Sequence, residues 1–179
     1  MGSSESGEAD RSLLLFTRDF GLVRARAASL RSERSKMRYA LQDYCHADVS
    51  LVRGKAGWRA AGATAIMYAT GDTRGMQAFA RISELVVRLV HGEEVNEYLY
   101  QALVEAHGAL MVEKCEAFGM IEIICVARLL YSLGYISNEA LSSALFTHTA
   151  YTGESLLEAE TMRDKLIFSI NRAISETQL

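Results

Sequence analysis

Short apolar runs separated by turn residues fill the first 70 positions of the chain. Residues 13–16 form an apolar run, residues 17–21 have the composition of a turn, and residues 22–27 alternate between apolar and polar positions. This pattern predicts a β-hairpin. A third strand is predicted over residues 39–52, where the apolar spacing fits a half-buried sheet better than a helix, and one or two further strands over residues 58–68.

The count and punctuation of these strands indicate a small barrel. A glycine-bounded turn at residues 53–57 joins the third predicted strand to the next, and residues 1–10 are small and acidic, as in a flexible lead-in. A five-stranded barrel with basic turns fits the oligonucleotide-binding fold, the OB-fold, whose open face and loops follow a nucleic-acid backbone. Residues 11–72 are therefore predicted to be an OB-fold-like DNA-binding domain.

The pattern becomes helical near residues 71–75. Apolar residues then recur at i, i+3 and i+4, which predicts an all-helical domain over residues 73–179. The expected helices cover residues 76–91, 94–110, 112–133 and 137–146, and a last one begins at a cap on Thr152 or Ser155 and continues to residue 174. The predicted fold class is α+β, with a small β-barrel followed by helices.

Composition excludes several classes of protein. Half of the 179 residues are hydrophobic and 23% are charged, as in an ordinary globular chain. No apolar run approaches the ~20 residues of a membrane span, and the first residues lack the basic and apolar segments of a secretion signal, so a cytoplasmic protein is expected. The cysteines Cys45, Cys115 and Cys125 are far apart, which favours reduced thiols over a disulfide framework or a zinc site.

The net charge of −3 averages two unlike halves. Residues 1–75 carry twelve Lys and Arg against eight Asp and Glu, a net charge of +4, whereas residues 76–179 carry seven against fourteen, a net charge of −7. Such asymmetry is typical of a polyanion-binding part joined to a part that meets proteins, although chance segregation of surface charge is the alternative.

The densest positive stretch runs from residue 24 to residue 38, with Glu33 as its single acid. Side chains of this kind neutralise phosphates and release counterions, which adds affinity for nucleic acid that does not depend on sequence. The alternative is a solvated loop that is charged for solubility. The predicted DNA-binding residues of this stretch are Arg24, Arg26, Arg31, Arg34, Lys36 and Arg38.

A second basic group surrounds the glycine turn. Arg53, Lys55 and Arg59 extend the predicted DNA-binding surface, or else they decorate the tip of a hairpin. Trp58 could stack on a base, since aromatic faces bind bases of any sequence, or it could be a half-buried aromatic of the barrel. Phe20, in the first hairpin turn, is a candidate plug of the barrel.

Catalytic candidates are weak, so a non-enzymatic protein without cofactor or metal is expected. The four histidines show no metal-ligand spacing, and neither a nucleophile elbow nor a phosphate-cradling glycine loop is present. A hydrolase using Cys45 or His46 is the least favoured alternative, because adjacent residues on a strand point to opposite faces. The acids Glu93, Glu94 and Glu97 are typical of a solvated helix start.

Four segments of the chain resemble the RecO family of bacterial recombination mediators. GEADRSLLLFTRDFGLVRARA at residues 7–27 is the most distinctive, because it carries G-E-x-D followed by L-F-T-R-x-x-G-x-V-R-A. The others are SKMR at residues 35–38, LQDYCHADVSLVRGKAGW at residues 41–58 and INRAISETQL at residues 170–179. In the helical part, ARLLYSLGY agrees in pattern more than in motif.

The resemblance implies an OB-fold followed by a helical domain, and a nucleoid-associated DNA repair function. It implies binding of single- and double-stranded DNA, annealing of complementary strands, and work with RecR and single-strand-binding protein to load the recombinase. It also implies a basic groove in the helical domain for the acidic tail of single-strand-binding protein. The cations available for that groove are Arg81, Arg88, Lys114, Arg128, Arg163, Lys165 and Arg172.

Two departures from the family pattern leave alternatives open. An apolar strand usually precedes the G-E-x-D segment, but here only MGSSES does, so either the barrel lacks its first strand, or it leaves an edge unpaired, or the chain is a shortened form. Many members also carry a four-cysteine zinc site that this chain lacks. The second functional hypothesis is therefore a protein–protein adaptor that has lost DNA binding together with that strand.

Overall fold

The structure is a computed structural model that describes residues 1–6, 10–30, 32, 35–69, 72–112, 115–137 and 144–176. Contacts divide the chain into a sheet unit, Met1–Thr70 with Ser83–Val95, and a helical unit, Gly71–Ile82 with Asn96–Leu179. The division falls inside the first helix, α1 (Thr73–Leu89). The chain enters the helical unit at Gly71, returns to the sheet unit after Ile82, and enters the helical unit again at Asn96.

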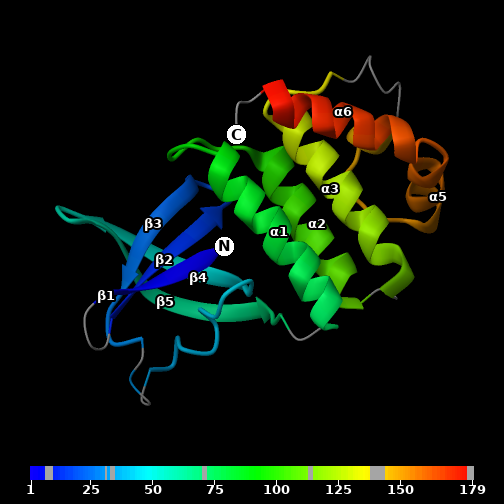
Figure 1. Cartoon of the computed structure of the whole chain (residues 1–179). Coiled ribbons are helices and arrows are strands. Elements are labelled where there is room, and N and C mark those ends of the chain that lie inside the picture. Colours follow the sequence, from blue (N-terminus) through cyan, green and yellow to red (C-terminus); the bar gives the residue numbers. More distant parts are fainter. Residues whose placement is uncertain are drawn as a thin grey trace. The chain divides into compact units, whose positions relative to one another are not determined.

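The sheet unit contains five strands in the order β1-β2-β3-β5-β4. Their bounds are β1 Gly2–Ser6, β2 Asp10–Thr17, β3 Gly21–Ala27, β4 His46–Gly54 and β5 Gly57–Met67. The neighbours are antiparallel except for β3 and β5, which pair in parallel at Ala25–Trp58 and Arg26–Arg59 (Figure 1). The predicted α+β class is confirmed, with an OB-like sheet that does not close: β1 and β4 form no ladder in the described residues.

The predicted first hairpin is confirmed. Strands β2 and β3 pair from Arg11–Ala27 to Thr17–Gly21, around a three-residue turn. The Thr17 hydroxyl accepts a hydrogen bond from the Phe20 N–H over 3.1 Å, which closes the turn locally. Gly21 follows with a φ of +64°, a conformation that favours glycine.

The expectation that the first strand is absent was wrong. Gly2–Ser6, placed by sequence in the flexible lead-in, forms β1 and pairs along its whole length with β2, from Gly2–Leu14 to Ser6–Asp10. Backbone pairing explains the error, because a strand is held by N–H and C=O groups that every residue carries, whatever its side chains. The hydrophobic pattern of GSSES is therefore no guide to its structure.

The third strand begins later in the chain than the sequence predicted. Residues 39–45 form turns, with Tyr44 at a φ of +62°, and β4 begins only at His46. The apolar spacing there serves burial in a loop instead of a sheet, since Leu41 is 4% exposed. Residues 58–68 hold a single long strand, β5, joined to β4 by the predicted glycine-bounded turn.

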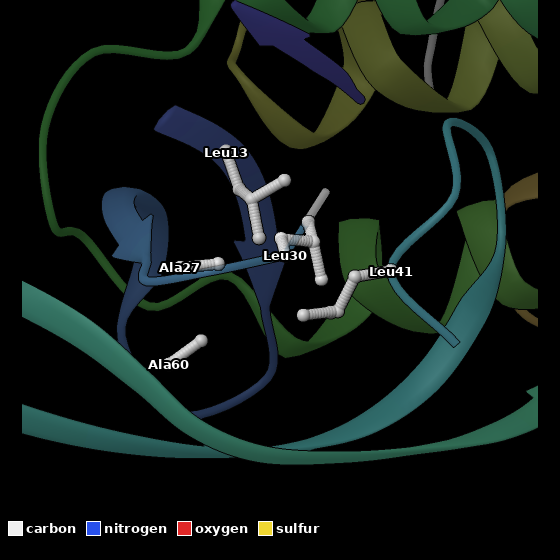
Figure 2. Packing of buried hydrophobic residues seen from close by; sticks show 5 residues of the cluster. All are labelled: Leu13, Ala27, Leu30, Leu41 and Ala60. Carbon is white, nitrogen blue, oxygen red and sulfur yellow. The ribbon is translucent and has the colours of Figure 1, made fainter. Parts of the chain in front are cut away.

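The core of the sheet unit explains why that loop is apolar. Leu41 packs in one cluster with Leu13 of β2, Ala27 of β3, Ala60 of β5 and Leu30 of the loop after β3 (Figure 2). Two of the five residues therefore come from loops. Both lie in the single segment that joins β3 to β4, which must fold onto the sheet to complete its interior; the same segment carries Lys36 and Arg38.

In the described residues, the helical unit contains the first part of α1 and the helices α2 (Glu97–Val112), α3 (Phe118–Ser132), α5 (Gly153–Thr161) and α6 (Arg163–Glu176) (Figure 1). It also has 3₁₀ turns at Cys115–Ala117 and Ala144–Phe146. Helix α3 is buried on most of its surface, as its apolar sequence predicts. Of the helix expected over residues 137–146, residues 138–143 lie outside the described part of the chain.

The last predicted helix is two helices. Thr152 caps α5 with a capping box: its hydroxyl accepts the Ser155 N–H, and the Ser155 hydroxyl accepts the Thr152 N–H. The predicted cap on Thr152 is thus confirmed, and Ser155 completes it. Met162 then separates α5 from α6. In the part of the chain that the structure describes, no helix has both the length and the apolar character needed to cross a membrane.

Candidate nucleic-acid interface

The outer face of the sheet gathers three of the predicted DNA-binding arginines. Arg24 and Arg26 alternate on β3 with the fully buried Ala25 and Ala27, so their side chains lie on the opposite face of the sheet from the core. Arg59 of β5 is paired with Arg26 in the parallel register and shares that outer face. All three are exposed. Sequence alternation placed Arg24 and Arg26 on one face, but only the strand order brings Arg59 beside them.

The three arginines differ in how free their charges are. Arg26 donates to the Asp10 carboxylate, with 2.8 Å between Nε and Oδ2, whereas Arg24 and Arg59 form no ion pair with any residue that the structure describes. Asp10 also accepts the Ser29 N–H over 2.8 Å. The hydrogen bond from the Ser29 N–H lowers the pKa of Asp10 most, and the hydrogen bond from the Arg26 guanidinium lowers it further. Asp10 therefore stays charged, and Arg24 and Arg59 are the freer positive charges of the outer face.

Trp58 lies on the other side of the sheet, in a cluster beside the turn of the β4–β5 hairpin, where it pairs with Arg53. Its ring centroid is 4.7 Å from that of Phe20, and the Arg53 guanidinium lies 5.3 Å from the centre of the indole. Trp58 is neither fully buried nor fully exposed. Phe20, at 40% exposure, covers this cluster instead of filling the core. Lys55 is exposed at the tip of the same hairpin.

Glu93 completes the cluster, and sequence reasoning missed it. Its carboxylate accepts the Trp58 indole N–H over 2.8 Å and pairs with Arg53 over 3.2 Å. Glu93 follows α1 and is 35 residues beyond Trp58 in sequence, so no local signal links the two. The sequence assigned Glu93 to a solvated helix start, but α2 begins later, at Glu97, where the Asn96 side chain accepts the Leu99 N–H.

The loop after β3 holds the remaining predicted residues. Lys36 is exposed, and Arg38 stacks on the ring of Tyr39 at 4.9 Å while donating to its hydroxyl over 2.8 Å. Arg31 and Arg34 lie outside the described residues. The predicted site is therefore divided into an outer face, a hairpin cluster and a loop.

The catalytic alternative finds no support in the geometry. Burial raises the pKa of the Cys45 thiol, which disfavours the thiolate that a nucleophile needs, and lowers the pKa of His46. The Cys45 thiol donates to the Met67 carbonyl over 3.3 Å. Among the described residues, no three His, Cys, Asp or Glu side chains gather closely enough to hold a metal ion.

The cations proposed for a groove in the helical unit are mostly engaged. Arg128 is fully buried and donates to the carbonyls of Leu145 and Thr149, so it is wrong as a groove residue. Arg81, Arg163 and Arg172 pair with Glu122, Glu160 and Glu176. Lys114 lies outside the described residues. A groove of about 660 Å³ does exist beside α6, lined by Tyr135, Asp164, Lys165, Phe168, Arg172 and Glu176 among others.

Sequence comparisons connect this sheet unit to a known family. Residues 1–59 match the family described as "Recombination protein O N terminal", a range that includes β1 to β4 and the first residues of β5. Arg24, Arg26 and Arg59 all lie inside the match. The helical unit lies outside it.

Three proteins named DNA repair protein RecO, all from strains of Dehalococcoides mccartyi, are similar to this chain. One, from strain 195, is 28% identical over 158 residues, which cover 76% of this chain and 62% of the relative. Another, from strain BAV1, is 35% identical over 56% of this chain and 41% of the relative. A third, from strain CBDB1, is 47% identical over 53 residues, 30% of this chain and 21% of the relative.

The chain thus spans less than two thirds of the length of each of these relatives. The family match and the named relatives agree with the motifs of the first third of the sequence. They confirm that this chain, most specifically in its sheet unit, resembles the bacterial DNA repair protein RecO.

Proposed function

We propose that this chain is a DNA-binding recombination mediator in DNA repair. It anneals complementary single strands and helps to load the recombinase onto DNA that is coated with single-strand-binding protein. One observation carries the proposal: inside the region that matches the RecO N-terminal family, Arg24 and Arg59 lie together on the outer face of the sheet without an acidic partner among the described residues.

The proposed mechanism is electrostatic and requires no bond chemistry. Arginines on the outer face bind phosphates of two strands and release their counterions, which lowers the repulsion between the strands and allows complementary bases to pair. Residues 1–75, which include all five strands, carry a net charge of +4, and residues 76–179 carry −7, so DNA is attracted to the former and repelled by the latter. The helical unit is thereby left for protein partners.

A binding titration with labelled single-stranded DNA at two salt concentrations, beside a strand-annealing assay, tests the proposal. Binding should weaken steeply with salt, because each phosphate contact on a single strand contributes a slope of about −0.7 to log K against log salt. Annealing should be fastest at low salt. Undetectable binding, or binding that is insensitive to salt, would contradict the proposed function.

Two protein partners belong to the proposal, RecR and single-strand-binding protein. For the second, the groove beside α6 offers Lys165, which suits an acidic tail, together with the exposed Phe168 and Tyr135. Asp164 and Glu176 also line it, so Lys165 would carry most of the attraction. The Lys165→Glu variant should bind a tail peptide more weakly than wild type. An unchanged affinity would show that the tail does not bind in this groove.

The adaptor alternative has lost its main argument. It required that DNA binding had disappeared with the first strand, but Gly2–Ser6 forms that strand as β1. The annealing assay separates the two functions, because an adaptor would bind its partners without accelerating annealing.

A further inference from the structure

Glu93 occupies the place where the hairpin cluster could receive a phosphate. Its two carboxylate oxygens are used separately, Oε1 by the Trp58 indole N–H at 2.8 Å and Oε2 by Arg53 at 3.2 Å. Both donors belong to the predicted DNA-binding residues, and both lie on adjacent strands where Arg53 and Trp58 are register partners. A carboxylate that accepts from an arginine and a neighbouring N–H presents the same charge and acceptor chemistry as a phosphate.

The same contact limits what Trp58 can do. The indole is held from one side by Phe20, at 4.7 Å between ring centroids, and from another by Arg53, at 5.3 Å. With Glu93 bound at its N–H, the ring has a fixed orientation, and Arg53 has an internal counterion. A nucleic-acid phosphate that pairs with Arg53 and accepts the indole N–H of Trp58 must therefore replace Glu93.

We propose that Glu93 is an intramolecular competitor of nucleic-acid phosphate, which holds Arg53 and Trp58 in an occupied state until single-stranded DNA displaces it. The inference rests on the proposed DNA-binding function. Glu93 is exposed, and its pair with Arg53 is solvent-accessible at both side chains, 66% for Arg53 and 39% for Glu93. The carboxylate can therefore be displaced easily, since exposed ion pairs contribute little to stability.

Competition has a direct consequence for selectivity. A phosphate can take over both contacts of Glu93, because its oxygens accept from the guanidinium and from the indole N–H, and an unpaired base beside that phosphate adds stacking on the indole face. Single-stranded DNA provides both, whereas the bases of a duplex are stacked and unavailable to the indole. Removing the Glu93 charge should thus relax the preference for single strands at this cluster.

The test compares Glu93→Gln with Glu94→Gln. The two variants lose the same charge one residue apart, but the Glu94 side chain forms no ion pair with the described residues, so it controls for the general loss of repulsion toward DNA. Trp58 is the only tryptophan of the chain, so its fluorescence reports directly on the cluster. Full-length protein is titrated with labelled single-stranded DNA while both the label and the tryptophan emission are followed.

The expected result is an affinity about three- to tenfold higher in Glu93→Gln than in wild type, with a change below about twofold in Glu94→Gln. DNA should also change the Trp58 emission of the wild-type protein. If DNA binds but Trp58 emission is unchanged, or if Glu93→Gln binds no more tightly than Glu94→Gln, the inference fails and the proposed function stands. If wild-type protein binds no DNA, both fail together.

Discussion

Asp10, the last residue of the G-E-x-D segment, fastens the end of the first hairpin. It accepts hydrogen bonds from the Ser29 N–H and from Arg26. Ser29 has a φ of +53°, a backbone conformation that residues other than glycine rarely adopt. The carboxylate therefore stabilises the turn that leads from β3 into the basic loop. This local role explains why an acid belongs in a segment otherwise suited to phosphates.

Asp10 should make the stability of the protein depend on pH at the acidic end. The pKa of Asp10 is lowered in the folded state. Its contribution to the free energy of unfolding is therefore fully present above the usual pKa of 3.8 and is lost as pH falls through the folded-state pKa. Asp10→Asn should lower the melting temperature at pH 6, with a difference from wild type that shrinks below pH ~3.8. Thermal unfolding of both proteins across this range checks it; a difference that is constant with pH would contradict the assignment.

Gly21, where β3 begins, combines a positive φ with a close backbone approach. A Cβ at this position would lie 2.2 Å from the Glu94 carbonyl oxygen, which belongs to backbone and cannot move aside cheaply. Gly57 also has a positive φ, of +99°, but no atom lies within 4 Å of its added Cβ. The pair therefore separates backbone strain from steric clash.

Alanine at each position should reveal this difference. Gly57→Ala should cost about 1–2 kcal/mol of unfolding free energy through strain alone, and Gly21→Ala should cost more than about 3 kcal/mol. Urea unfolding measures both. Equal losses of unfolding free energy would show that the backbone at Glu94 can move aside at no cost. The contact of this backbone segment with the first hairpin would then not be rigid.

At the scale of elements, Arg128 holds the irregular segment before α5 against α3. Its guanidinium donates to the carbonyls of Leu145 at 2.9 Å, Thr149 at 2.7 Å and Ala150 at 3.4 Å, and it lies 4.7 Å from the centre of the Tyr151 ring. One side chain thus supplies hydrogen-bond donors to three backbone carbonyls of this segment. Burial among these residues also raises the pKa of Cys125 to about 12, so its thiol stays protonated.

Arg128→Met should therefore destabilise the helical unit by about 3–5 kcal/mol, because it removes the buried hydrogen bonds that the guanidinium donates to the segment before α5. The matched control is Arg81→Met, which removes an exposed ion pair with Glu122 and should cost less than about 1 kcal/mol. Chemical denaturation with both variants gives the comparison. Similar losses would mean that the segment from Leu145 to Ala150 finds other donors.

For the whole molecule, the location of charge should matter more than its amount. Arg24→Glu with Arg59→Glu reverses the outer face of the sheet, and Arg163→Glu with Arg172→Glu makes the same net change on the helices. The first pair should abolish annealing and reduce the salt slope by about 1.4, two phosphate contacts at about 0.7 each. The second pair should leave both nearly unchanged. Equal effects on binding and annealing would make net charge, and not the sheet, the cause.

The sequence alone predicted the elements whose side-chain pattern matches their secondary structure. The hairpin of β2 and β3, the glycine-bounded turn before β5, the apolar helix α3 and the cap at Thr152 all follow from local chemistry. Motifs in the first third also indicated the resemblance to the RecO family, which the match over residues 1–59 supports. These features require only neighbours in sequence, so the sequence of one chain carries enough information to predict them.

Tertiary structure decided everything that depends on pairing between distant segments. Strand β1 exists because its backbone groups pair with β2, although GSSES has no strand pattern, and Leu41 is buried because its loop folds onto the sheet. The order β3-β5 placed Arg59 beside Arg26. The ion pair that joins Arg53 to Glu93 bridges 40 positions of sequence. Hydrophobic period and composition are blind to such contacts, because they describe single residues whereas a site is built from the residues that the fold brings together.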